Sequence, residues 1–175
     1  MNTERLAELR GGFDAAFAAP PPRHAEDSEA LILIQAAGEA LALNTRHIAG
    51  LARWRLILPV PSRIPELLGI AGIRGTLTPV YDLAALLGFP SQRPEPRWLA
   101  LTGQEMAAAL AFNEFEGQVD VPRTCLYVDR ASPAGRHMGT MARIGSSVRA
   151  VIDVPAILDA IRRQAGLTET DKEQR

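Results

Sequence analysis

The sequence is poor in residues that cross-link and in long apolar runs. Cys125 is the one cysteine among 175 residues, so the chain cannot form an internal disulfide, a usage typical of a reducing compartment. No apolar run reaches the roughly 18–20 residues of a membrane span. The start, MNTERLAELRGG, has no basic segment followed by an apolar one, as a signal peptide would. These absences predict a cytoplasmic protein without direct membrane insertion.

An excess of charge of either sign is also lacking. Nineteen Lys and Arg face twenty Asp and Glu, which gives a net charge of −1 and a pI near 6.3, and the aromatics are five Phe, two Trp and two Tyr. Nucleic-acid binding relies on a basic face and, for single strands, on stacking aromatics. This composition therefore argues against a nucleic-acid partner. A phosphate-binding loop is missing too, since RGGFD does not follow a strand.

Patterns typical of metal sites and active sites are missing as well. The histidines are scattered, and Cys125 belongs to no C-x-x-C pair, so that it reads as a small apolar residue of the strand TCLYV. The acidic segment EFEGQVDVP is interpreted as a loop, and nothing supplies its carboxylates with a partner base. We therefore expect no catalytic residue, no metal and no cofactor. The residues considered are His24, His47, His137, Glu114, Glu116 and Asp120.

What the chain does contain is a β-rich body between two polar ends. Residues 1–29 are interpreted as an N-terminal extension with a Pro-rich linker, residues 30–166 as the folded domain and residues 167–175 as a charged tail. The extension has four apolar residues at helical spacing, interrupted by two glycines. It is therefore either a docking helix for a partner or a loosely packed terminus. The four residues are Leu6, Leu9, Phe13 and Phe17.

The body reads as short strands with two short helices. A hairpin is expected around Gly75, and Asp82 is the expected N-cap of a short helix that ends before Gly88. Asp153 is the expected cap of a last helix, VPAILDAIRRQAG. The expected strands are LILIQA, EALALN, HIAGLA, IAGIR, TLTPVY, WLALT, AAALAF, TCLYV, TMARI and VRAVI.

The two halves of the body, about 30–90 and 97–166, resemble each other. LILIQAAGEALALN is similar to LALTGQEMAAALAFN, and PVYDLAALL is similar to AVIDVPAIL. This predicts a duplicated small β unit whose two copies share a core, because each alone is too short to bury one comfortably. Arg74 breaks the symmetry, since IRGT in the first half corresponds to IGSS in the second. That asymmetry favours a role of Arg74 specific to one half over a solvated arginine that merely closes the turn.

The first half resembles the CheW-like domain of bacterial chemotaxis coupling proteins. The motif residues are Ile48-Ala49-Gly50-Leu51, Pro59-Val60-Pro61, Gly69 through Gly75, Pro79-Val80-Tyr81-Asp82-Leu83 and Gly88. The sequence departs from the family pattern at three points. Gly50 stands in place of a glutamate, Gly72-Ile73 replaces an asparagine ahead of the R-G pair, and Phe112-Asn113 replaces a V-D pair.

The resemblance implies a mostly β fold of two intertwined five-stranded SH3-like barrels, with short helices and a C-terminal helix. It implies a non-enzymatic adaptor that couples the cytoplasmic tips of chemoreceptors to a CheA-type histidine kinase. The implied partner-binding residues are Arg74, Ile73, Gly75, Ile48, Leu51 and Gly50, with the three apolar ones either contacts or core. The implied structural residues are Pro61, Gly69, Pro79, Asp82, Leu83 and Gly88.

Fold alone does not decide function, since small barrels serve many uses. A small-barrel module for another peptide or for a nucleic acid therefore remains the alternative. Trp54 and Trp98 are candidates for partner anchors, although a place in the core or at a barrel seam suits their large apolar area better.

Overall fold

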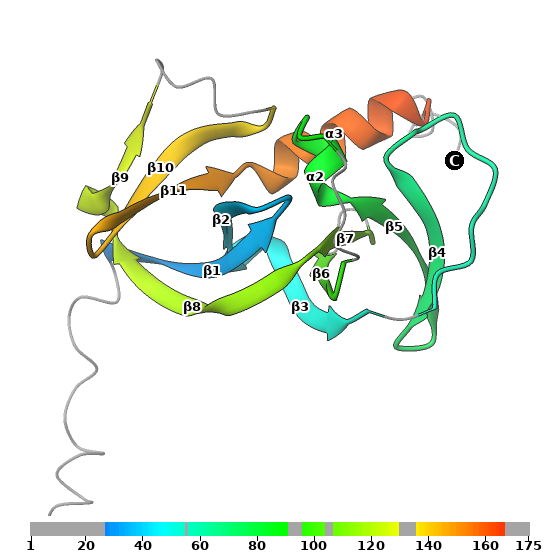
Figure 1. Ribbon diagram of the computed structural model, residues 1–175, viewed down its shortest axis with the longest axis horizontal. Coiled ribbons are helices and arrows are strands. Elements are labelled where there is room, and N and C mark those ends of the chain that lie inside the picture. Colours follow the sequence, from blue (N-terminus) through cyan, green and yellow to red (C-terminus); the bar gives the residue numbers. More distant parts are fainter. Residues whose placement is uncertain (1–26, 55, 91–95, 104–106, 130–135, 167–175) are drawn as a thin grey trace, which may run out of the picture.

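The structure, a computed structural model, describes residues 27–54, 56–90, 96–103, 107–129 and 136–166. Most of the N-terminal extension, including its four apolar residues and His24, lies outside the described residues, and so does the charged tail. The described part consists of strands and short helices arranged as two sheets (Figure 1). The predicted mostly β fold class is therefore confirmed.

The two sheets differ by one strand. The first sheet has the order β8 (Glu114–Pro122), β1 (Ser28–Ala36), β2 (Glu39–Asn44), β11 (Ser147–Ile152), β10 (Met138–Ile144) and β9 (Leu126–Val128). The second sheet has the order β3 (Ile48–Arg53), β6 (Trp98–Thr102), β7 (Ala109–Phe112), β5 (Thr76–Asp82) and β4 (Leu67–Ile73). The resemblance implied five strands each, and the first sheet has a sixth because the segment EFEGQVDVP, which was not among the expected strands, forms β8 and pairs with β1. The helices are η2 (Thr45–His47), α2 (Leu83–Leu86), η3 (Arg123–Cys125) and α3 (Val154–Gln164).

The two halves of the chain exchange hairpins, which is what intertwines the sheets. The antiparallel pair β1–β2 comes from the first half, yet β2 runs parallel to β11 of the second half, with Leu41 opposite Ala150. Reciprocally, β6–β7 comes from the second half, and β7 runs parallel to β5 of the first, with Leu110 opposite Tyr81. In Figure 1 the blue hairpin accordingly lies beside the orange strand β11. Neither half completes a sheet without the other.

The exchanged strands are buried on both faces, and this explains their unbroken apolar sequences. In β1, Leu31 packs in a small core inside the first sheet, whereas Ile32 and Ile34 pack in a larger core shared by both sheets. In β6, Leu99 packs in a third core inside the second sheet, and Ala100 faces the shared core. A strand with two buried faces needs an apolar residue at every position rather than at alternate ones.

Both α-helices cover the shared core. Leu83 and Leu86 of α2 are buried there together with Ile157 and Ile161 of α3, so the two helices pack over the junction between the sheets. Each helix begins after a parallel-paired strand, α2 after β5 and α3 after β11, and each is capped by an aspartate. This repetition agrees with the predicted duplication.

The interpretation of EFEGQVDVP as an acidic loop was wrong. The segment is β8, a nine-residue edge strand that pairs with β1 from Ser28 opposite Pro122 to Gln35 opposite Glu114. Its burial alternates strictly: Glu114, Glu116, Gln118 and Asp120 are exposed and the residues between them are covered. The carboxylates therefore line the solvent face of an edge strand, where charge discourages pairing with another chain.

Candidate partner-binding surface

Arg74 lies at the tip of the β4–β5 hairpin, in a conformation that arginine rarely adopts. Ile73 is paired with Thr76, so Arg74 and Gly75 form a two-residue loop, with φ angles of 50° and 81°. Two positive φ angles define the type I′ turn that matches the twist of a hairpin. Glycine takes this conformation freely, whereas an L-residue loses about 1–2 kcal/mol there.

The equivalent hairpin of the second half avoids this cost. The β10–β11 loop begins at Gly145, which has a φ of 59° and follows Ile144 as Arg74 follows Ile73. The fold thus requires a left-handed residue at this point of both hairpins. One copy meets the requirement with glycine and the other carries an arginine in spite of it. The turn does not require an arginine, since the β1–β2 hairpin places Ala37 at the same position with a φ of 53°.

The guanidinium of Arg74 reaches across the second sheet to its opposite edge. A Cβ built on Gly50 would lie 3.0 Å from Nη2 of Arg74, although β3 and β4 are the two outermost strands of that sheet. Near this place the edges also meet through Leu58, which follows β3 and exchanges two backbone hydrogen bonds of 2.9 Å with Ile70 of β4. The second sheet therefore curls on itself as a barrel does, and Arg74 lies where its edges approach.

The other predicted partner-binding residues occupy different environments. Gly75 is exposed, and no atom lies within 4 Å of where its Cβ would be. Glycine is therefore favoured here by the positive φ of the turn rather than by a lack of space for a side chain. Ile73 is only 5% exposed and packs inside the second sheet, so it supports the hairpin from the core. Ile48 and Leu51 are half-buried against the shared core. The structure thus brings Arg74, Gly75 and Gly50 to one surface.

The predicted structural residues have identifiable local contacts. Asp82 caps α2, since its carboxylate accepts hydrogen bonds from the backbone N–H groups of the next turn at 3.0 and 3.3 Å. Leu83 is fully buried behind it, and Gly88 follows the helix with a φ of 82°. At Gly69 the backbone of Leu58 passes so close that a Cβ would lie 2.2 Å from its carbonyl oxygen. Pro79 is half-buried in β5 opposite Ile70, and Pro61 is exposed between β3 and β4.

Exposed apolar side chains accompany the Arg74 hairpin. Leu77 of β5, 71% exposed, lies opposite Gly72, which has no side chain to cover it. Leu58, 56% exposed, bridges to the same strand β4. Trp54 is 37% exposed. Trp98 is half-buried and packs against Phe115, and the guanidinium of Arg53 lies 4.5 Å from the centre of the Trp98 ring. Exposed leucine, tryptophan and arginine side chains on one sheet are residue types that occur at protein–protein contacts.

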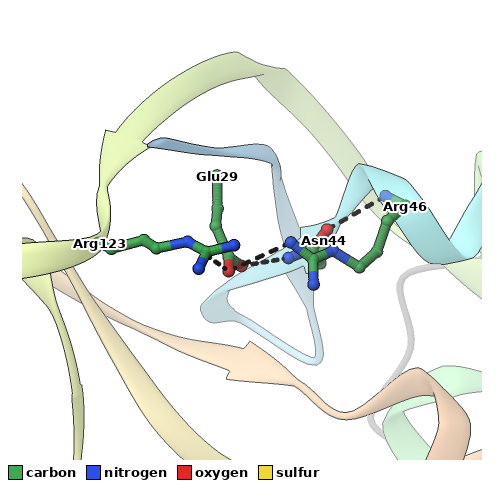
Figure 2. Close-up of polar contacts among 4 residues, drawn as sticks. All are labelled: Glu29, Asn44, Arg46 and Arg123. Carbon is green, nitrogen blue, oxygen red and sulfur yellow. Dashed lines mark hydrogen bonds and ion pairs between the residues drawn. The ribbon is translucent and has the colours of Figure 1, made fainter. Parts of the chain in front are cut away.

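Sequence reasoning missed a polar cluster around Glu29, which had been assigned to the linker. The Glu29 carboxylate accepts a hydrogen bond from Asn44 and pairs with Arg46 at 3.2 Å and Arg123 at 3.6 Å (Figure 2). Asn44 in turn accepts from the backbone N–H of Arg46 and caps η2. The cluster ties β1, β2 and η3 together where the chain leaves the first sheet for β3.

A second missed network crosses the first sheet. The Glu116 carboxylate pairs with Arg149 of β11 at 2.6 Å and accepts a hydrogen bond of 2.8 Å from Gln35 of β1. The hydrogen bond from Arg149 lowers the pKa of Glu116, although partial burial opposes the shift. These contacts hold β8 and β11 across the two strands between them, which is a structural role.

Catalytic and metal chemistry finds no support among the described residues. No group of three or more His, Cys, Asp or Glu side chains within them could hold a metal ion. Cys125 is half-buried and packs against the core inside the first sheet. The described feature that stands out on the surface is the Arg74 hairpin with its exposed Leu77.

Comparisons with known proteins identify the class of protein. The family profile of the CheW-like domain matches residues 30–162. The chain is 22% identical to "Chemotaxis protein CheW" of Bacillus subtilis (strain 168) over 149 residues, which are 81% of this chain and 94% of that protein. The scaffolding protein TtCheW from Thermoanaerobacter tengcongensis superposes with a TM-score of 0.64 at 15% identity, over 71% of this chain and 88% of the other.

The fold and surface define a scaffold with two intertwined SH3-like barrels. Because the profile spans both halves, the chain belongs to the CheW-like family. It is accordingly a non-enzymatic chemotaxis adaptor. Among the described helices, none is long and apolar enough to cross a membrane.

Proposed function

We propose that this chain couples the cytoplasmic tips of chemoreceptors to a CheA-type histidine kinase in chemotaxis or motility signalling. The observation that carries the proposal is the family match over residues 30–162, which includes both barrels. An adaptor with two linked barrels offers separate surfaces to two partners. We assign residues 28–166 to this domain, because β1 begins at Ser28, two residues before the boundary of 30 expected from the sequence, with 1–27 as an extension and 167–175 as a tail.

The receptor-facing surface is the one formed by Arg74, Gly75 and Gly50, with Leu77 in the same hairpin. The support is the strained hairpin arginine, its exposed guanidinium and the 71% exposed leucine in the same hairpin. A guanidinium with apolar neighbours suits a helical partner that presents a carboxylate among apolar side chains. In this arrangement the protein is recruited to membrane receptor arrays through the receptors.

Co-sedimentation tests this function. Membranes carrying a chemoreceptor from the same bacterium are mixed with its purified CheA-type kinase, with and without the full chain, and the pelleted kinase is measured. We expect the kinase to pellet with receptor membranes only when the chain is present. Receptor-free membranes are the control. If the chain pellets with receptor membranes but brings no kinase, or does not pellet at all, the coupling function is wrong.

A further inference from the structure

A pocket opens between η2 and the first turns of α3. Its volume is about 310 Å³, near the lower end of the roughly 300–1,000 Å³ that is typical of ligand pockets. One wall is apolar, because Val154 is fully buried, Leu158 is 8% exposed, and both line the cavity together with Pro155. A pocket of this size and lining suits one aromatic side chain rather than a whole helix.

The opening of the pocket is mainly basic. Arg46 and His47 of η2 line it from one side and Arg162 of α3 from the other, while Asp159 is the acidic side chain among the described residues that line it. Asp159 pairs with Arg162 at 3.0 Å, so the two η2 side chains leave the opening with an excess of positive charge. A fitting occupant therefore combines an apolar side chain with a carboxylate.

The N-terminal extension joins the folded domain at the rim of this pocket. Glu29, the second residue of β1, pairs at 3.2 Å with Arg46, which lines the opening (Figure 2). The stretch FDAAF, residues 13–17, contains both phenylalanines of the extension and one carboxylate, Asp14, but no basic residue. Ten residues separate Phe17 from β1, and they include three consecutive prolines. A polyproline-like chain of that length reaches about 30 Å, which is ample for a pocket that begins one side chain away from β1.

We infer that residues 13–17 of the extension bind in this pocket of the same chain. A phenylalanine ring packs on the apolar wall formed by Val154 and Leu158, and the Asp14 carboxylate faces the basic opening. A short linker holds such a segment near its site at an effective concentration on the order of millimolar, so that a weak contact suffices. The extension then covers the surface between η2 and α3 in the free protein. The inference holds whichever partner the adaptor binds.

NMR spectra of the ¹⁵N-labelled full chain test this docking. The unaltered chain is compared with the double variant Phe13→Ser, Phe17→Ser, whose substitutions lie outside the folded domain and should leave its thermal melt unchanged. We expect the amide signals of His47, Gly103 and Leu158 to shift, because an aromatic ring has left the pocket that they line. If no signal of the folded domain shifts, the inference is refuted. Shifts that cluster on another surface would show that the segment docks elsewhere, which also refutes the pocket.

Dilution separates docking within one chain from docking between two copies. We expect the pocket signals of the unaltered chain to keep their positions on dilution, because a tethered segment binds independently of the protein concentration. Pocket signals that move towards their positions in the double variant on dilution would show that a second copy supplies the segment. That result would overturn the inference.

Two glycine variants provide a matched control. Gly103 lines the pocket and Gly139 lies in β10 outside the lining; a Cβ at either would meet no atom within 4 Å, and neither has a positive φ. Gly103→Leu should fill the pocket and release the segment, so that the backbone order parameter of Phe17 falls from about 0.85 to below about 0.6. Gly139→Leu should leave the order parameter unchanged. Equal order parameters in the two variants would overturn the inference, and if Gly103→Leu does not melt cooperatively, the phenylalanine variant decides.

Discussion

Replacing Arg74 with glycine should make the protein more stable while it removes the proposed contact. Arg74 has a φ of 50°, and the corresponding residue of the sister hairpin, Gly145, has a φ of 59°. Arg74→Gly therefore places in the first hairpin the residue that the second already uses. The guanidinium is exposed and lies over a bare glycine, so little packing is lost.

The size of the effect follows from two opposing contributions. Leaving the left-handed region relieves an L-residue of about 1–2 kcal/mol. Glycine loses more backbone conformational entropy on folding than arginine does, which lowers the free energy of unfolding by about 0.5–1 kcal/mol. The net expectation is a gain of about 0–1.5 kcal/mol in the free energy of unfolding, with a midpoint near 0.75 kcal/mol, or a rise of about 2–3 °C in Tm at that midpoint for a chain of this length.

Urea unfolding and thermal melts of the full chain measure this change. A comparison variant is Gly145→Arg, which places an arginine at a positive φ in the sister hairpin and should lower stability. The two losses are not expected to be equal, because Ser146, unlike Gly75, has no positive φ. If Arg74→Gly instead destabilises the protein by more than about 1 kcal/mol, beyond the usual surface range, then Arg74 holds the barrel together. The argument that it is kept for binding would then be wrong.

Three further predictions concern the fold. Asp82→Ala should cost about 1 kcal/mol in urea unfolding, because two backbone N–H groups of α2 lose their acceptor, while Asp82→Asn should keep most of the stability. Gly69→Ala should lower the Tm of the protein far more than Gly72→Ala. A Cβ at Gly69 would lie 2.2 Å from a backbone oxygen, whereas a Cβ at Gly72 would meet nothing within 4 Å. Equal Tm values of the two variants would contradict this prediction. The hydrogen bond from Arg149 lowers the pKa of Glu116 in the folded protein below its unfolded-state value, which is near 4.3. The contribution of this pair to the free energy of unfolding should therefore be complete above the unfolded-state pKa and be lost as the pH falls through the folded-state pKa. Glu116→Gln should remove that pH dependence from urea unfolding.

The sequence was sufficient to predict the local elements because their signals are local. The hairpin around Gly75, the aspartate cap of α2 and the repetition of both in the second half depend on residues within a few positions of one another. The apolar segments LILIQA and WLALT also predicted buried strands correctly. The duplication predicted only that two similar units share a core, and the intertwining of the sheets was implied by the family resemblance. The exchange of hairpins could not be derived from local patterns, because parallel pairing of β2 with β11 joins residues more than a hundred positions apart.

The candidate site was less accessible to sequence reasoning. Gly75 predicted a left-handed turn, but the positive φ of Arg74 itself and its reach to Gly50 depend on the curl of the whole second sheet. The segment EFEGQVDVP was interpreted as a loop because it contains several acidic residues. The alternation of its polar and apolar residues, which is typical of an edge strand, would have predicted β8. Glu29 was missed because the linker composition upstream extended into the first strand.

The central claim is that this adaptor binds its receptor-type partner through Arg74, and one calorimetric experiment tests it directly. The full chain is titrated with the cytoplasmic fragment of a chemoreceptor from the same bacterium, as the unaltered protein, as Arg74→Glu and as Arg143→Glu. Arg143 is an exposed arginine in strand β10 of the sister hairpin. We predict that Arg74→Glu weakens binding about 30-fold or more, the scale of an interface hot spot. Arg143→Glu should bind like the unaltered chain, and all three should melt alike. Unchanged affinity of the folded Arg74→Glu protein would contradict the account.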